Sequence, residues 1–224
     1  MLFQKLMGKG PTSMISPSAP KGLWSWGSYQ NGQLGLGDAV SRSSPVQVGA
    51  SIAWASVSAA QSNVSHATKT DGTLWGWGGN SLGQLGLGDT TSRSSPVQVG
   101  TLATWSAVGA GESYRTFAIK TDSTLWAWGD NASNNYGTLG LGDIVNRSSP
   151  VQVGTLATWS LLGVASGAAF AVKIDRTLWG WGSNNNGRLG LGDVVFRSSP
   201  VQVGTLASWI KIEGGNNQSL GIHV

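Results

Sequence analysis

The sequence is dominated by a motif of about 51 residues that occurs four times. Its clearest element, Leu-Trp-x-Trp-Gly, begins at Leu23, Leu74, Leu125 and Leu178, at spacings of 51, 51 and 53 residues. Each copy continues with Leu-Gly-Leu-Gly-Asp, then Arg-Ser-Ser-Pro-Val-Gln-Val-Gly, then one further tryptophan, so all 12 tryptophans occupy three motif positions. Self-similarity at this period is typical of solenoids and propellers.

Each copy of the motif reads as four short strands. Thr116–Lys120 and Leu125–Trp128 are short β-rich runs, and the equivalent pair in the preceding copy is joined by Asp71-Gly72, a favoured hairpin turn. Pro-Val-Gln-Val and the stretch around the third tryptophan supply the other two strands. Four strands in about 50 residues make one propeller blade. The prediction is an all-β, four-bladed β-propeller over residues 23–224, with blades starting near residues 23, 74, 125 and 178, and a short N-terminal tail at 1–22.

The two ends of the repeat region complement each other. The first copy opens on Leu23 and lacks the strand equivalent to Thr116–Lys120, whereas Ser219–Val224 aligns with that strand. We therefore expect the C-terminal strand to complete the first blade, because ring closure removes open sheet edges. Exchange of this strand between two chains is the alternative.

The tryptophans are expected to form the core and the contacts between blades. A buried tryptophan hides roughly 150–250 Å², worth about 4–6 kcal/mol as an upper estimate. A sugar- or base-stacking surface is the competing interpretation, and it would expose most of the large apolar groups. One or two tryptophans at a blade tip would still suffice to bind a ligand.

Charge and composition argue against several partner classes. The net charge is +4, but Lys5, Lys9 and Lys21 supply +3 of it, which leaves the remaining residues nearly neutral. Nucleic-acid binders concentrate basic residues on one face, so no nucleic-acid partner is expected. No apolar run is long enough to span a membrane, and the chain has no cysteine.

Residues that suggest catalysis or metal binding are few or recur in every copy. Gly79–Gly83 matches the nucleophile-elbow pattern but lacks its strand–turn–helix context. His66 and His223 have no further ligands nearby in sequence. The four aspartates that end Leu-Gly-Leu-Gly-Asp each precede an arginine by four residues, which favours a structural turn. We predict no enzyme activity, no metal and no cofactor.

What differs between the copies is the better guide to binding. The loops after Trp-Gly vary, and loops on a rigid scaffold often carry function. The candidate loop contacts are Tyr29, Gln30, Asn31, Asn80, Tyr136 and Asn185. In the N-terminal tail, Leu2, Phe3, Leu6 and Met7 would line one side of a short helix and are the candidate docking residues.

The segment Trp77 to Asp89, Trp-Gly-Gly-Asn-Ser-Leu-Gly-Gln-Leu-Gly-Leu-Gly-Asp, together with Pro-Val-Gln-Val, resembles the signature of the regulator-of-chromosome-condensation repeat family. The resemblance covers residues 23–224. It implies a propeller with blades of this length. Members of that family serve as exchange factors, chromatin binders and interaction platforms. The best-known members have seven blades, whereas this chain has four repeats.

The near-identical copies are similar to repeats of bacterial and phage genomes. With the short apolar N-terminus, this likeness implies a non-enzymatic virion component, a capsid decoration or tail-associated protein. It would dock to a protein assembly through the tail and display the propeller outward. The alternative is a free-standing propeller module that binds a protein or a surface glycan.

Overall fold

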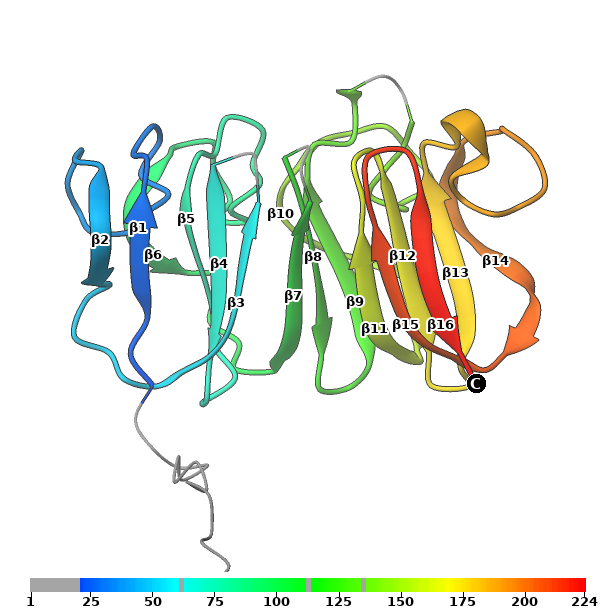
Figure 1. Cartoon of the computed structure of the whole chain (residues 1–224), viewed down its shortest axis with the longest axis horizontal. Coiled ribbons are helices and arrows are strands. Elements are labelled where there is room, and N and C mark those ends of the chain that lie inside the picture. Colours follow the sequence, from blue (N-terminus) through cyan, green and yellow to red (C-terminus); the bar gives the residue numbers. More distant parts are fainter. Residues whose placement is uncertain (1–20, 61–62, 112–113, 134–135) are drawn as a thin grey trace, which may run out of the picture.

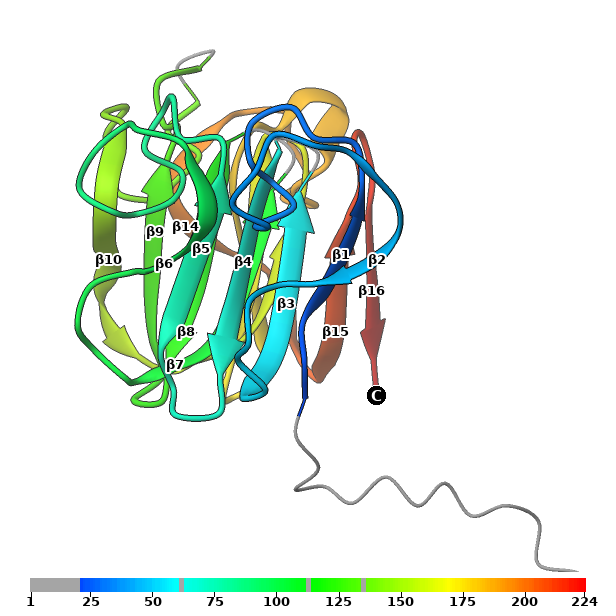
Figure 2. The same cartoon turned by 90° about the vertical axis from the view of Figure 1, so that its left-hand side faces the viewer.

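The computed structural model describes residues 21–60, 63–111, 114–133 and 136–224. They form an all-β arc of sheets that stand side by side, with the strands of every sheet running between the same two ends of the molecule (Figures 1 and 2). In this part of the chain, no helix is long and apolar enough to span a bilayer. The proposed docking residues Leu2, Phe3, Leu6 and Met7 lie outside the described residues.

Three sheets are complete four-stranded blades, each a meander of antiparallel strands. The second blade contains β3 (Trp54–Ala60), β4 (Val64–Lys69), β5 (Leu74–Gly78) and β6 (Arg93–Gln98). The third contains β7 (Trp105–Gly111), β8 (Arg115–Lys120), β9 (Thr124–Gly129) and β10 (Arg147–Ala157). The fourth contains β11 (Trp159–Val164), β12 (Ala168–Lys173), β13 (Thr177–Gly182) and β14 (Arg197–Ala207). These blades confirm the predicted propeller class.

Two further sheets have only two strands each. The N-terminal half-blade contains β1 (Trp24–Gly27) and β2 (Arg42–Gln47), which correspond to the two outer strands of a blade. The C-terminal half-blade contains β15 (Trp209–Gly214) and β16 (Ser219–His223), which correspond to the two inner strands.

Closure of the first blade by the C-terminal strand is not found among the described strands. β16 pairs with β15, β1 pairs with β2, and no ladder joins the two half-blades. Figure 1 shows them well apart along the long axis of the molecule. The reason is the curvature of the arc, because the packing angle between neighbouring blades leaves the ends apart after four repeats. The prediction of closure within one chain is therefore wrong for this structure.

The repeated tryptophans bury themselves where the sequence predicts. Trp77, Trp128 and Trp181 lie on the third strand of the complete blades and are at most 3% exposed. Each packs against the tryptophan of the innermost strand of its own blade, for example Trp105 against Trp128 with ring centroids 6.0 Å apart. The exceptions are Trp24 and Trp26 on β1, which are 52% and 60% exposed.

The loop that carries Leu-Gly-Leu-Gly-Asp also packs against a tryptophan of the next blade. The indole N–H of Trp77 donates to the carbonyl of Gln33 in the preceding loop (3.0 Å), and that of Trp128 donates to Gln84 (2.9 Å). Gly86 has a φ of +74°, and a Cβ there would lie 2.7 Å from Trp128 Nε1. Glycine is therefore required for both the backbone conformation and the close approach.

Candidate functional site

The loops that follow β1, β5, β9 and β13 gather at one end of the propeller, uppermost in Figure 1. We call this end the loop face. It holds all six predicted loop contacts, and it differs most between the copies of the motif. The loop face is therefore the surface on which a partner-specific site would be expected.

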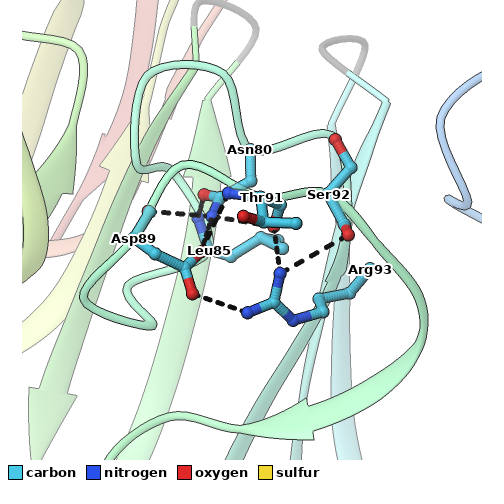
Figure 3. A network of polar contacts seen from close by, with 6 residues as sticks. All are labelled: Asn80, Leu85, Asp89, Thr91, Ser92 and Arg93. Carbon is cyan, nitrogen blue, oxygen red and sulfur yellow. Dashed lines mark hydrogen bonds and ion pairs between the residues drawn. The ribbon is translucent and has the colours of Figure 1, made fainter.

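A buried asparagine organises the loop in each complete blade. In the second blade the Asn80 side-chain amide donates to the Asp89 carbonyl (2.9 Å), to Asp89 Oδ1 (3.1 Å) and to the Thr91 carbonyl (3.1 Å). Its Oδ1 accepts the backbone N–H of Leu85 at 2.9 Å (Figure 3). Asn131 and Asn184 make the same contacts to Asp143 and Asp193. The network ties the two ends of each loop together.

The prediction that Asn80 is a surface contact is corrected by this geometry. Asn80 is 0% exposed, and its amide is committed to the loop backbone. The equivalent residue of the first repeat is Tyr29, so the first loop lacks this asparagine network. Gln33 Oε1 accepts the backbone N–H groups of Gln30 and Asn31 there, much as Gln84 Oε1 accepts that of Leu82 in the second blade. Gln30 and Asn31 are exposed and Tyr29 is half-buried.

The Asp–Arg pair of each loop is structural, as its repetition predicts. Asp89 Oδ2 lies 2.6 Å from the Arg93 guanidinium, and Asp89 Oδ1 accepts the backbone N–H of Thr91 at 2.8 Å (Figure 3). The hydrogen bond from the Thr91 N–H, and to a smaller extent the one from Arg93, lower the pKa of Asp89 below its usual value. The carboxylate is thus kept ionised as a fixed acceptor within the loop.

At the opposite end of the blades, a lysine lies between two tryptophans. Lys120 Nζ is 3.6 Å from the Trp126 ring centroid and 4.9 Å from that of Trp105. Lys69 and Lys173 repeat the arrangement. Burial lowers the pKa of Lys120 and of Lys173. Because all complete blades share this cation–π contact, it belongs to the scaffold.

One feature of the loop face does not repeat. Tyr136, from the loop of the third blade, packs against Phe196, from the loop of the fourth blade, with ring centroids 4.2 Å apart. Asn185 Nδ2 donates to the Tyr136 hydroxyl at 3.5 Å. The structure thus brings together two predicted contacts, Tyr136 and Asn185, and adds Phe196.

Exposed apolar side chains extend this contact. Val194 and Val195 are 64% and 59% exposed, and Phe196 is 40% exposed. We call Tyr136, Asn185 and Val194–Phe196 the apolar loop patch. Sequence reasoning missed Val194–Phe196, although a signal was present: the equivalent residues are Ala-Val-Ser, Thr-Thr-Ser and Ile-Val-Asn in the other repeats. Only the fourth repeat has three apolar residues there.

The structure brings together no arrangement of nucleophile, base and acid at this patch, since its polar groups are an amide and a phenol. In the residues that the structure describes, no group of three His, Asp or Glu gathers in a way that could hold a metal ion. The chemistry available at the patch is apolar contact framed by hydrogen-bonding groups. That combination is typical of surfaces that bind proteins.

Comparison with known proteins agrees with the repeat architecture. The family model of the regulator of chromosome condensation (RCC1) repeat matches residues 22–64, 71–118, 122–174 and 176–222. The chain belongs to the RCC1 repeat family. The ultraviolet-B receptor UVR8 of Arabidopsis thaliana is 35% identical over 184 residues, which cover 80% of this chain and 41% of UVR8. The human E3 ubiquitin-protein ligase HERC2 is 28% identical over 71% of this chain and 4% of HERC2.

Solved structures show the same fold at lower identity. Human WBSCR16 superposes with a TM-score of 0.78 at 22% identity, over 92% of this chain and 54% of WBSCR16. Prp20p of Saccharomyces cerevisiae gives a TM-score of 0.76 at 18% identity, over 90% of this chain and 52% of Prp20p. This RCC1-repeat chain therefore spans about half the length of these two propellers.

Proposed function

We propose that this chain is a non-enzymatic protein-interaction module that contacts a protein partner through the apolar loop patch. The observation that carries the proposal is the exposure of Val194, Val195 and Phe196 beside Tyr136. Three consecutive apolar residues in an exposed loop are unfavourable in water and mark a contact surface.

Proteins that share the fold bind other proteins. Yeast Prp20p has binding properties to Gsp1p and histones, and Kap60 binds yeast RCC1 (Prp20). These partners belong to Prp20p. They support only the general proposal that a propeller built from RCC1 repeats serves as a platform for protein partners.

The chain itself offers a matched replacement for testing the patch. Val194, Val195 and Phe196 would be exchanged for Thr, Thr and Ser, the residues of the second blade at 90–92. We expect at least a tenfold loss of the partner recovered from the native source, with an unchanged circular dichroism spectrum. Val40→Thr, in the loop of the first repeat, is the control because Val40 is also exposed (54%) but lies outside the patch. If the triple variant recovers as much partner as the unchanged protein, the proposal is contradicted. If the unchanged protein binds a sugar on a glycan array and the triple variant does not, the ligand of the patch is a sugar and not a protein.

The finer proposal is that the module is a virion component docked through residues 1–22. Its support is the resemblance to phage-type repeats and the apolar residues Leu2, Phe3, Leu6 and Met7. Deletion of residues 2–20 should abolish incorporation into particles while the propeller still folds. Particles that incorporate the truncated chain normally would overturn this docking mode.

A further inference from the structure

A cavity of about 240 Å³ lies between the third and fourth blades, both of which are complete. The third blade lines it with Leu141 from its loop and with Val153 and Leu156 from β10. The fourth blade adds a tryptophan from β11, a second tryptophan from β13 and Lys173 from β12. Lys173 is the one charged residue in this lining. Mostly apolar walls with a few placed polar groups are typical of sites for small molecules.

The side chain of Lys173 faces this cavity. Side chains alternate along a strand, so Lys173 lies on the same face of β12 as Ala169 and Ala171. These two alanines pack against side chains of the third blade in one core cluster. Lys173 is therefore directed at the third blade, and its Nζ lies 3.6 Å from the ring centroid of Trp179 and 5.2 Å from that of Trp159.

The ammonium of Lys173 has hydrogen-bonding capacity that the protein leaves unused. The residue is only 9% exposed. Within the described part of the chain, its Nζ makes no hydrogen bond and no ion pair, and it contacts the two indole rings instead. Asp175 raises the pKa of Lys173 against the larger, lowering effect of burial, but Asp175 Oδ1 accepts the N–H and the hydroxyl of Thr177. An ammonium has three donors, and unpaired donors in a buried position are unfavourable. An anionic acceptor in the cavity would pair them.

The size and the lining of the cavity define the ligand class. A carboxylate matches the single ammonium, and the tryptophan and leucine side chains match an apolar body. At about 30 Å³ for each group of the size of a water molecule, 240 Å³ holds about eight non-hydrogen atoms. Hexanoate has six carbons and two oxygens, so it fits this volume. A folded protein segment does not.

We propose that the cavity between the third and fourth blades binds a small organic monocarboxylate with a short apolar body. The carboxylate accepts hydrogen bonds from Lys173 Nζ, and the apolar body lies against Trp159, Trp179 and Leu156. Binding is non-covalent. The cavity shares no residue with the apolar loop patch, so this site does not depend on the proposed protein partner.

The preceding blade interface supplies a matched control. The same residue types recur there, and Lys120 Nζ is also 3.6 Å from a tryptophan centroid, that of Trp126. Lys120→Met and Lys173→Met therefore remove the same kind of cation–π contact at two different interfaces. Only Lys173→Met removes the charge from the cavity between the third and fourth blades.

The first test is an NMR titration of the full chain with hexanoate. The signal to follow is the indole N–H of Trp179, which donates to Thr177 Oγ1 at 2.9 Å and is assigned from the spectrum of Trp179→Phe. Hexanoate should shift this signal with a dissociation constant on the order of 1 mM. Lys173→Met should weaken binding at least tenfold, whereas Lys120→Met should leave the titration of Trp179 unchanged.

The second test uses the unchanged protein, so it remains decisive if Lys173→Met does not fold. Hexanamide has as many non-hydrogen atoms as hexanoate but no charge. Acetate has the charge but lacks the apolar body. Both should bind at least tenfold more weakly than hexanoate in the same Trp179 titration, because each lacks one of the two features that the cavity recognises.

Four results would overturn the proposal. They are a Trp179 signal that hexanoate does not shift, equal affinities for hexanoate and hexanamide, equal affinities for hexanoate and acetate, and a Lys173→Met protein that titrates like the unchanged one. Equal weakening by Lys120→Met and Lys173→Met would also contradict it, because the effect would then come from the loss of a cation–π contact and not from the charge in this cavity.

Discussion

His66 and Trp128 meet edge to face across the interface between the second and third blades, with ring centroids 6.0 Å apart. Phe117 and Trp181 make the same contact at the next interface, at 5.8 Å. A histidine thus occupies a position that the other two complete blades fill with phenylalanine, Phe117 and Phe170. It is fully buried, and burial lowers its pKa to about 4.

This burial makes the stability of the protein dependent on pH. Between pH 6.5 and about 4 the unfolded chain binds a proton at His66 that the folded chain does not, so stability falls as the pH falls through this window. At 1.36 kcal/mol per pKa unit, the loss is about 3 kcal/mol. His66→Phe should remove this part of the pH dependence and stabilise the protein most at pH 4. Urea unfolding of both proteins from pH 4 to 7 measures it, and equal slopes in the two would contradict the expectation.

The Asn80 network predicts a large cost for a small change. Asn80→Ala leaves the buried Leu85 N–H and the Asp89 carbonyl without their partner. The expected loss in free energy of unfolding is about 2–4 kcal/mol. Asn31→Ala is the control and should stay within about 0.5 kcal/mol because Asn31 is exposed. Equal effects in thermal or urea unfolding would argue against the structural role of Asn80.

The close contact between the Gly86 loop and Trp128 of the next blade predicts different losses in free energy of unfolding when two glycines with similar backbone conformations are replaced by alanine. Gly86 and Gly100 have φ values of +74° and +64°, but only a Cβ at Gly86 meets a neighbour, Trp128 Nε1 at 2.7 Å. Gly100→Ala should cost about 1 kcal/mol from the backbone alone. Gly86→Ala should cost about 2–4 kcal/mol, because overpacking adds to the backbone term. Chemical denaturation compares the two, and an equal cost would show that the loop moves aside.

A buried ion pair is peculiar to the third blade. The Arg115 guanidinium lies 3.6 Å from Asp130 Oδ2, and both side chains are at most 5% exposed. Arg115→Val should cost about 3–5 kcal/mol because it leaves a buried carboxylate unpaired. The second blade has Val64 and Gly79 at these two positions, so adding Asp130→Gly should recover at least half of the loss. A double variant less stable than Arg115→Val in urea unfolding would contradict this.

Much of the fold could be predicted from the repeat, because hairpin pairing is local. The Leu-Trp-x-Trp-Gly run and the strand before it are neighbours in sequence, and their turn fixes the register. The burial of Trp77, Trp128 and Trp181 follows from the same repetition. The loop contacts were harder to predict, because Asn80 and Asn185 are the same residue type in similar loops, yet one is buried and the other exposed.

The sequence by itself determined the blade, its four strands and the tryptophan core, since each depends on contacts within one repeat or between adjacent repeats. Only the tertiary structure decided whether the ring closes. Closure depends on the angle between packed sheets, which accumulates over all the blades and leaves β1 and β16 apart. The apolar loop patch is likewise a product of tertiary structure, because Tyr136 and Phe196 are 60 positions apart in sequence and meet only when the loops of two blades lie together.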